Sequence, residues 1–361
     1  MWKDMPIDLF TVILEKSVDV HAQEKNGNTA LHLAIMYKST IAITELLKHR
    51  DLDVNLKNND NQTALHFSCL WEDMPIDLFK IILEKSANIN AQDEYGCTAL
   101  HWAILCEFKT AVEELLKHKD ADVNLKNNDN QTACHFTTLW KNIPIDLFRI
   151  ILEKSTAVIA QNEKELTILR AAIVNRSKTV VEELLKRGEL DVKVKYKDNQ
   201  TVLHLATLWE NMPIDLFRII LEKSTDVNVQ NEDGETALHC ACRYMFKTAI
   251  TELLKRKDVD VNMKNNDNRT SLHFATKWKN MPMDLFKNIL EKTTDVNAQD
   301  KHGWTALHWA IAMENRTAVE ELLKRKDVDV NLKNKNNQTA RFFSTFWEDM
   351  PIDLLSIILD K

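Results

Sequence analysis

Glycine is scarce in this chain, with five residues among 361. Phosphate-binding loops and the strained turns that carry a catalytic serine both depend on closely spaced glycines, and the sequence has no such cluster. No apolar run approaches the ~18 residues that cross a bilayer, and the first residues lack the pattern of a secretory signal. The sequence therefore predicts neither an enzyme of these classes nor a protein inserted in a membrane.

Cysteine usage and charge balance restrict the setting further. The six cysteines follow no repeated pairing, which favours a reducing compartment and hence the cytoplasm. The formal net charge of −7, with both signs interleaved, argues against a general nucleic-acid or membrane-surface binder. We expect a cytoplasmic protein whose partner is not nucleic acid.

The prolines and most of the tryptophans recur with one period. All six prolines stand 69 residues apart, and six of the nine tryptophans obey the same spacing. The prolines are Pro6, Pro75, Pro144, Pro213, Pro282 and Pro351. A fixed period over the whole length indicates tandem duplication and predicts a solenoid, which usually works through its long surface.

The period is itself double, because a threonine motif recurs at alternating intervals of 34 and 35 residues. We call the two kinds of copy A repeats and B repeats. The A threonines are Thr29, Thr98, Thr167, Thr236 and Thr305, and the B threonines are Thr63, Thr132, Thr201, Thr270 and Thr339. Most copies read Thr-Ala-Leu-His at this point.

Each repeat has the same expected layout. A glycine in A or an asparagine in B lies two residues before the threonine, and both tolerate the left-handed backbone of a tight turn. The threonine then caps a short helix, such as 31–36. A second, amphipathic helix follows, and in B it begins at the proline. The repeat closes with Asp-Val-Asn or a relative, as at residues 53–55.

This layout resembles the ankyrin repeat over essentially the whole chain. The resemblance implies an all-α, right-handed ankyrin-repeat solenoid of helix-turn-helix units with short β-turn fingers. We expect a partial repeat over 1–23, with the second helix and loop only. Ten repeats follow over 24–361, starting near residues 24, 58, 93, 127, 162, 196, 231, 265, 300 and 334.

The chain also departs from the family pattern. The family's glycine between the two helices is absent throughout, and the repeat at Thr167 is the most divergent, with Glu165 at the turn glycine and Arg170 at the motif histidine. Neither end shows a distinct polar capping repeat. We therefore expect a piece of a longer array, or ends covered by a partner, including end-to-end self-association.

Eight histidines occupy the motif, one in each repeat except those at Thr167 and Thr339. The family resemblance implies that they belong to an internal polar network that ties neighbouring repeats. Their spacing gives no metal-ligand cluster. His239, Cys240 and Cys242 are close in sequence, but side chains one and three positions apart on a short helix do not converge on a metal. We expect no enzyme, cofactor or metal.

Comparison of the copies points to a binding surface. The resemblance implies a concave face formed by the turn tips, four, three and one residues before the threonine, and by the end of the first helix, seven and eight residues after it. These positions barely change among B repeats and change completely among A repeats, whose cores stay nearly fixed. Neutral drift would have scrambled both sets.

The candidate partner-binding residues therefore come from the A repeats. They are Lys25, Asn26, Asn28, Met36, Tyr37, Glu94, Tyr95, Cys97, Leu105, Cys106, Glu163, Lys164, Leu166, Asn175, Glu232, Asp233, Glu235, Arg243, Tyr244, Lys301, His302, Trp304 and Met313. The mixed charge of the tips predicts a partner with patches of both signs, and the stretch 232–235 favours a basic segment.

The periodic tryptophans allow two interpretations. Trp71, Trp140, Trp209, Trp278 and Trp347 could act as secondary aromatic anchors for a partner. Their link to a following Met-Pro or Ile-Pro favours the other interpretation, in which they pack against the longer B turn.

The sequence thus predicts a protein-protein interaction scaffold that binds along the concave surface. Two alternatives stay open: a structural spacer rod within a larger multidomain protein, and a host-directed effector of a symbiont, parasite or virus.

Overall fold

The computed structural model describes residues 19–155, 168–186, 196 and 198–361. The candidate residues Glu163, Lys164 and Leu166, and most of the expected partial repeat, lie outside the described residues. The chain divides into two compact units, which we call the N-terminal unit (Met1–Leu190) and the C-terminal unit (Asp191–Lys361).

Both units are helical, and the described residues contain no sheet, only one isolated bridge between Lys333 and Thr339. The helices of the N-terminal unit are α2 (Ala30–Met36), α3 (Thr40–Lys48), α4 (Ala64–Cys69), α5 (Ile76–Lys85), α6 (Ala99–Leu105), α7 (Lys109–Lys117), α8 (Ala133–Phe136), α9 (Ile145–Lys154), α10 (Ile168–Val174) and α11 (Lys178–Lys186).

The C-terminal unit repeats the same alternation of shorter and longer helices. Its helices are α12 (Val202–Ala206), α13 (Ile214–Lys223), α14 (Ala237–Arg243), α15 (Lys247–Lys255), α16 (Ser271–Ala275), α17 (Met283–Lys292), α18 (Ala306–Ala312), α19 (Arg316–Lys324), α20 (Ala340–Ser344) and α21 (Ile352–Asp360).

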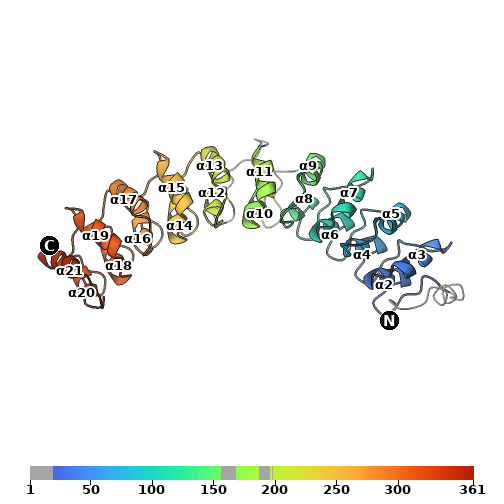
Figure 1. Cartoon of the computed structure of the whole chain (residues 1–361), viewed down its shortest axis with the longest axis horizontal. Coiled ribbons are helices and arrows are strands. Elements are labelled where there is room, and N and C mark those ends of the chain that lie inside the picture. The colour runs from blue at the N-terminus through green and yellow to red at the C-terminus, as the bar shows by residue number, and fades with distance from the viewer. Residues whose placement is uncertain (1–18, 156–167, 187–195, 197) are drawn as a thin grey trace. The chain divides into compact units, whose positions relative to one another are not determined.

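Each unit consists of two helical layers (Figure 1). In the N-terminal unit the first helices of successive repeats, α2, α4, α6, α8 and α10, pack in series, and α3, α5, α7, α9 and α11 form the second layer. In the C-terminal unit α12, α14, α16, α18 and α20 form one layer and α13, α15, α17, α19 and α21 the other. Residues at the same position of consecutive repeats are therefore neighbours along a row.

Local signals explain where the first helices begin. The Thr29 side chain accepts a hydrogen bond from the backbone N–H of His32, and His32 accepts one from the backbone N–H of Thr29, which closes a capping box. The expected left-handed turns are confirmed: Gly96 has φ +71° and Asn130 has φ +58°. The expectation that the proline is the first helical residue is off by one position, because Pro75 is the N-cap and α5 begins at Ile76.

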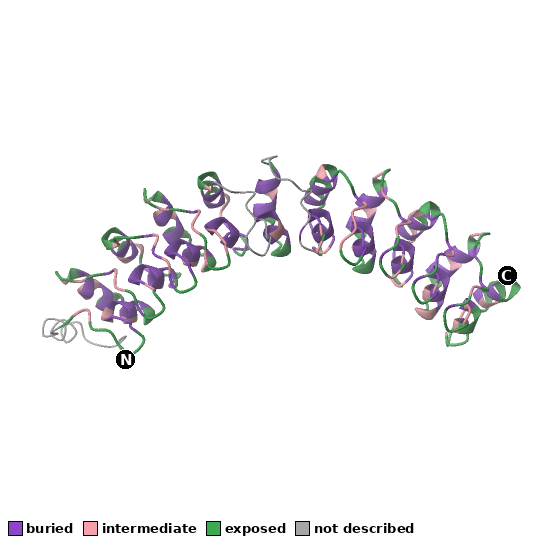
Figure 2. Cartoon of the chain, turned by 180° about the vertical axis from the view of Figure 1, so that it is seen from behind, coloured by how far each residue is buried: buried purple, intermediate pink, exposed green. Residues whose placement is uncertain are grey.

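The core of each unit lies between the two layers. Figure 2 shows buried residues where the helices of a unit face one another and exposed residues along the connecting loops. Four of the second B helices carry a fully buried phenylalanine, Phe79 and Phe148 in the N-terminal unit and Phe217 and Phe286 in the C-terminal unit. Burial of such side chains, at ~25 cal/mol per Å² of apolar surface, is what holds short helices of marginal intrinsic stability in place.

Candidate binding surface

The motif histidines tie neighbouring repeats together, as the family resemblance implied. Nδ1 of His32 accepts from the backbone N–H of Thr29 at 3.2 Å, and Nε2 lies 3.2 Å from the carbonyl oxygen of Gln62 in the next repeat. His239 Nε2 lies 3.1 Å from the carbonyl oxygen of Arg269 in the same way. Because desolvation disfavours the charged ring, burial lowers the pKa of His32 and of His239 to about 4.

This arrangement gives the histidines a structural role. In His32 and His239 both ring nitrogens are engaged within the protein, so neither is available to a ligand. Within the described residues no group of three or more histidine, cysteine or acidic side chains could hold a metal ion.

The described turn tips of each unit form a strip of bonded neighbours. The backbone N–H of Glu94 donates to the carbonyl of Asp60 at 2.9 Å, and the N–H of Asn128 donates to the carbonyl of Tyr95 at 2.9 Å. The C-terminal unit has the same bonds, for example from Lys301 N–H to Asp267 oxygen at 2.7 Å. Because each tip is bonded to the next, tip side chains from different repeats are held side by side.

Only two of the three expected tip positions face solvent. The residues four and three positions before the A threonine are exposed in every described A repeat. They are Lys25, Asn26, Glu94, Tyr95, Glu232, Asp233, Lys301 and His302. The residue directly before the threonine points inward: Asn28, Cys97 and Glu235 are buried, and Trp304 is half-buried. The expectation that this position is an exposed tip is wrong for Asn28, Cys97 and Glu235.

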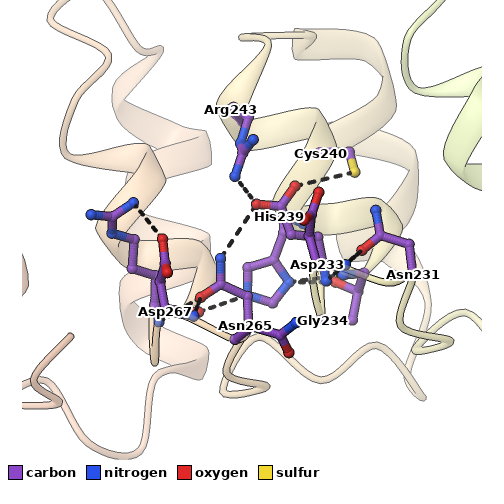
Figure 3. A network of polar contacts seen from close by, with 12 residues as sticks. Asn231, Asp233, Gly234, His239, Cys240, Arg243, Asn265 and Asp267 are labelled. Atoms are coloured by element: carbon purple, nitrogen blue, oxygen red, sulfur yellow. Dashed lines mark hydrogen bonds and ion pairs between the residues drawn. The ribbon is translucent and has the colours of Figure 1, made fainter. Parts of the chain in front are cut away.

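Glu235 shows what the inward-facing position does, and its partners Arg243 and Asn265 are labelled in Figure 3. Its carboxylate accepts from the guanidinium of Arg243 at the end of α14 and from Asn265 Nδ2, at 3.3 Å, in the next repeat. Desolvation raises the pKa of Glu235, and the nearby Arg243 opposes that shift. Glu235 and Arg243, both expected to contact a partner, therefore contact each other.

Trp304 is held within an aromatic cluster of the C-terminal unit. Its ring centroid lies 4.7 Å from that of Trp309 and 4.5 Å from that of Phe343 in the next repeat. Trp309 also donates from Nε1 to Asp300 at 3.2 Å, and Lys277 Nζ lies 3.7 Å from its ring centroid. These contacts join three repeats on the first-helix layer.

Within the described residues the periodic tryptophans are buried or half-buried. Trp71, Trp140 and Trp209 are 5–8% exposed, and Trp278 and Trp347 are half-buried. The backbone N–H of Met74 donates to the carbonyl of Trp71 at 2.9 Å, and Met74 is itself buried. The structure therefore favours packing against the B turn over a role as surface anchors.

The ends of the first helices provide an exposed row that the sequence comparison identified only in part. In the N-terminal unit the residue seven positions after each threonine is apolar and 41–56% exposed. These residues, which we call the apolar row, are Met36, Leu70, Leu105, Leu139 and Val174. Met36 and Leu105 were candidates, whereas Leu70 and Leu139 were missed because the B repeats were judged by their tryptophan. Aligning all copies on the threonine would have found them.

The other candidates at the helix ends differ in exposure. Tyr37 and Asn175 are exposed in the N-terminal unit, whereas Cys106 is half-buried. In the C-terminal unit Tyr244 is exposed and Met313 half-buried. Tyr244 borders a hollow of ≈ 380 Å³ that is also lined by Trp209, Met212 and Phe246.

Together the two layers, the bonded tips and the histidine network define a class, the helical solenoid built from tandem two-helix repeats. A family model described as ankyrin repeats (3 copies) matches residues 3–93, 72–161, 140–231, 203–300 and 278–350. The chain therefore belongs to the ankyrin-repeat family. Repeats of this family are in general protein-protein interaction modules and typically not enzymes.

Several curated proteins are similar to parts of the chain. A putative ankyrin repeat protein of Acanthamoeba polyphaga mimivirus is 26% identical over 260 residues, covering 65% of this chain and 33% of that protein. Rabankyrin-5 of Mus musculus is 25% identical over 255 residues, covering 68% and 21%. The human transient receptor potential cation channel subfamily A member 1 is 23% identical over 353 residues, covering 94% and 31%. The chain thus spans a third or less of the length of these relatives.

Among solved structures, the crystal structure of the ankyrin repeat domain of Bcl-3 is similar, with a TM-score of 0.50 and 23% identity. The match covers 64% of this chain and all of that domain, and it supports the fold alone. In the parts of the chain that the structure describes, none of the helices has both the length and the apolar character to span a bilayer.

Proposed function

We propose that this protein binds another protein along the concave surface formed by the turn tips and the ends of the first helices. The observation that carries the proposal is the row of exposed side chains, five apolar residues in consecutive repeats, that no described residue of the N-terminal unit covers. Contiguous exposed apolar surface of this kind is typical of interaction sites. The membership of the ankyrin family supports the same function.

The A repeats supply the contacts that distinguish one partner from another. Their exposed tips differ from copy to copy, with Tyr95 at 56% exposure and Glu232 and Asp233 also facing solvent. Exposed aromatic side chains such as Tyr95 and Tyr244 are suited to be anchors, because an aromatic ring buries much area at little conformational cost. The proposal places the protein in a reducing compartment, where its six cysteines stay free.

Site-specific photo-crosslinking tests this function. A crosslinking amino acid replaces Tyr95 or Tyr244 on the proposed surface, and Ile81 or Ile219 on the second-helix layer as matched controls of 37% and 36% exposure. We expect one and the same cellular protein to be captured from Tyr95 or Tyr244 and not from the controls. Equal capture from both layers, or none, would overturn the proposal and favour a spacer without a ligand of its own.

A further inference from the structure

The apolar row repeats at a distance that one kind of partner matches. Met36, Leu70, Leu105, Leu139 and Val174 occupy one position of five consecutive repeats whose first helices pack in series. Packed helices lie about 8–10 Å apart, so the row offers one apolar side chain about every 10 Å over a length of about 40 Å. An α-helix rises 1.5 Å per residue, so side chains seven residues apart stand about 10.5 Å apart on one face.

An extended segment fits this surface less well. The side chains of the row carry no hydrogen-bonding group, whereas an extended backbone needs partners for its N–H and C=O groups wherever it is buried. A helix satisfies these groups within itself and presents only side chains. The chemistry of the row therefore favours a helical occupant.

The surface between the row and the turn tips is also apolar. The first helices present Leu33 and Trp102, which are half-buried, and Phe67 and Phe136, which are 7% exposed. The longest first helix spans seven residues, which is about 10 Å. A helix with a diameter of about 10–12 Å would cover this width, with one flank on the apolar row and the other near the tips.

The charge of the turn tips determines which side chains the partner helix needs on the flank that lies near them. Among the described residues of the N-terminal unit, the charged side chains at the exposed tips are Lys25, Asp60, Glu94 and Asp129, so acids prevail there. Neither Asp60 nor Glu94 has an ion-pair partner among the residues that the structure describes. Electrostatic complementarity therefore calls for basic residues on the flank of the partner that faces the tips.

We infer that the N-terminal unit binds a basic amphipathic helix of about 29 residues, with apolar side chains repeating every seven residues and a flank of Lys or Arg. This inference rests on the proposed function and specifies the partner class for one of the two units. The second-helix layer lacks such a surface, because its exposed aliphatic residues, Ile41, Ile81 and Ile150, do not recur in each repeat.

Binding of synthetic peptides to the full chain tests the inference. The probe is a fluorescein-labelled helical peptide of about 29 residues with leucine every seven residues and lysine along one flank. Two controls have the same composition in a scrambled order, or glutamate in place of lysine. By fluorescence anisotropy we expect the probe to bind about tenfold or more tightly than either control. Equal binding of probe and scrambled peptide would overturn the helix assignment.

Variants of the full chain locate the probe. The row variant carries Leu70→Ser, Leu105→Ser and Leu139→Ser, and its matched control carries Ile81→Ser and Ile150→Ser on the other layer. The tip variant carries Asp60→Asn, Glu94→Gln and Asp129→Asn. We expect the row variant to bind the probe about tenfold more weakly than the native chain. The tip variant should show a smaller salt dependence of probe binding. The control should change neither the affinity nor its salt dependence. A row variant that binds the probe like its control would place the site elsewhere and overturn the inference.

Two further readouts separate the possible failures. Thermal unfolding of each variant tests whether the substitutions leave the fold intact. Sedimentation of the native chain and the row variant shows whether a second copy covers the row, which would overturn the helix assignment. If the probe does not bind while the crosslinks from Tyr95 and Tyr244 persist, the helix inference fails and the proposed function stands.

Discussion

The guanidinium of Arg243 is bonded to the buried carboxylate of Glu235, eight residues before it in the same repeat. The two positions vary together among the A repeats: Asn28 stands with Met36, Cys97 with Leu105, and Glu235 with Arg243. In the first two pairs an uncharged residue accompanies an apolar one. In the third pair an acid accompanies a base. Part of the variation that marked a binding surface is therefore internal compensation.

This pairing predicts the outcome of a double-mutant cycle. Arg243→Leu leaves Glu235 buried without its counter-charge and should lower the free energy of unfolding by about 1–3 kcal/mol. The double variant Glu235→Cys with Arg243→Leu reproduces the pair at residues 97 and 105, and should recover to within about 1 kcal/mol of the native value. Urea unfolding of the native chain, the two single variants and the double variant gives the four free energies of unfolding. Additive effects of the two changes would show that the pair is not coupled.

The histidine network predicts a loss of stability in mild acid. Burial lowers the pKa of His101, His239 and His273 to about 4, below the value of about 6.5 in an unfolded chain. Between these values the unfolded state binds more protons, so stability is complete above pH ~6.5 and falls as the pH drops. We expect a loss on the order of 1–2 kcal/mol per histidine between pH 7 and pH 5.

Urea unfolding at the two pH values checks this prediction. The variant His273→Asn should be less stable at pH 7 and show a smaller pH dependence, whereas His302→Gln, at an exposed tip, should keep the native dependence. Glu235, whose pKa is raised, opposes the trend but is a single group. A free energy of unfolding that stays constant from pH 7 to pH 5 would contradict the proposed role of the network.

The turns between the helices of the A repeats predict a stabilising change. Where the family has glycine, this chain holds Lys38, Glu107, Arg176, Met245 and Glu314 in the left-handed region, with φ between 52° and 63°. That conformation costs a residue with a Cβ about 1–2 kcal/mol. Glu107→Gly should therefore raise the free energy of unfolding by roughly 0.5–1 kcal/mol after the entropy of the unfolded glycine is counted.

The variant Gly96→Ala tests the same strain argument in the opposite direction, because it introduces a Cβ at a left-handed position. Gly96 has φ +71°, and an added Cβ would lie 2.6 Å from Asn128 Oδ1 and 2.9 Å from Asn128 N. The free energy of unfolding of this variant should be lower than that of the native chain by about 1 kcal/mol or more. Thermal unfolding of the two variants beside the native chain gives the comparison, and a Glu107→Gly protein that melts lower than the native one would refute the strain argument.

The division into two units predicts separable unfolding. Repeats stabilise only their neighbours, and the divergent repeat at Thr167 lacks the motif histidine that joins other repeats. Phe79→Ala in the N-terminal unit and Phe286→Ala in the C-terminal unit each remove a buried ring, at a cost of about 3–5 kcal/mol. Calorimetry should show each variant shifting a different transition. A single common transition in both variants would mean that the chain unfolds as one cooperative body.

Particular residues show which structural features could be predicted from the sequence. The threonine caps, the left-handed glycines and asparagines and the histidine bonds were predictable, because each depends on residues within one repeat or on the same position of the next. The inward orientation of Cys97 and Glu235 was not predicted. A residue between an exposed tip and a capping threonine can face either way, and the adjacent repeat decides which.

The sequence by itself determined the repeat period, the fold class and the left-handed turns before the threonines of the described repeats, because short-range capping and backbone preferences recur from copy to copy. Only the tertiary structure decided which side chains remain exposed. Trp71 is covered by the longer B turn, whereas Leu70, its neighbour in sequence, is 41% exposed and joins the apolar row. Exposure at a helix end depends on what the next repeat and the connecting loop place over it, and those contacts form only when the repeats stack.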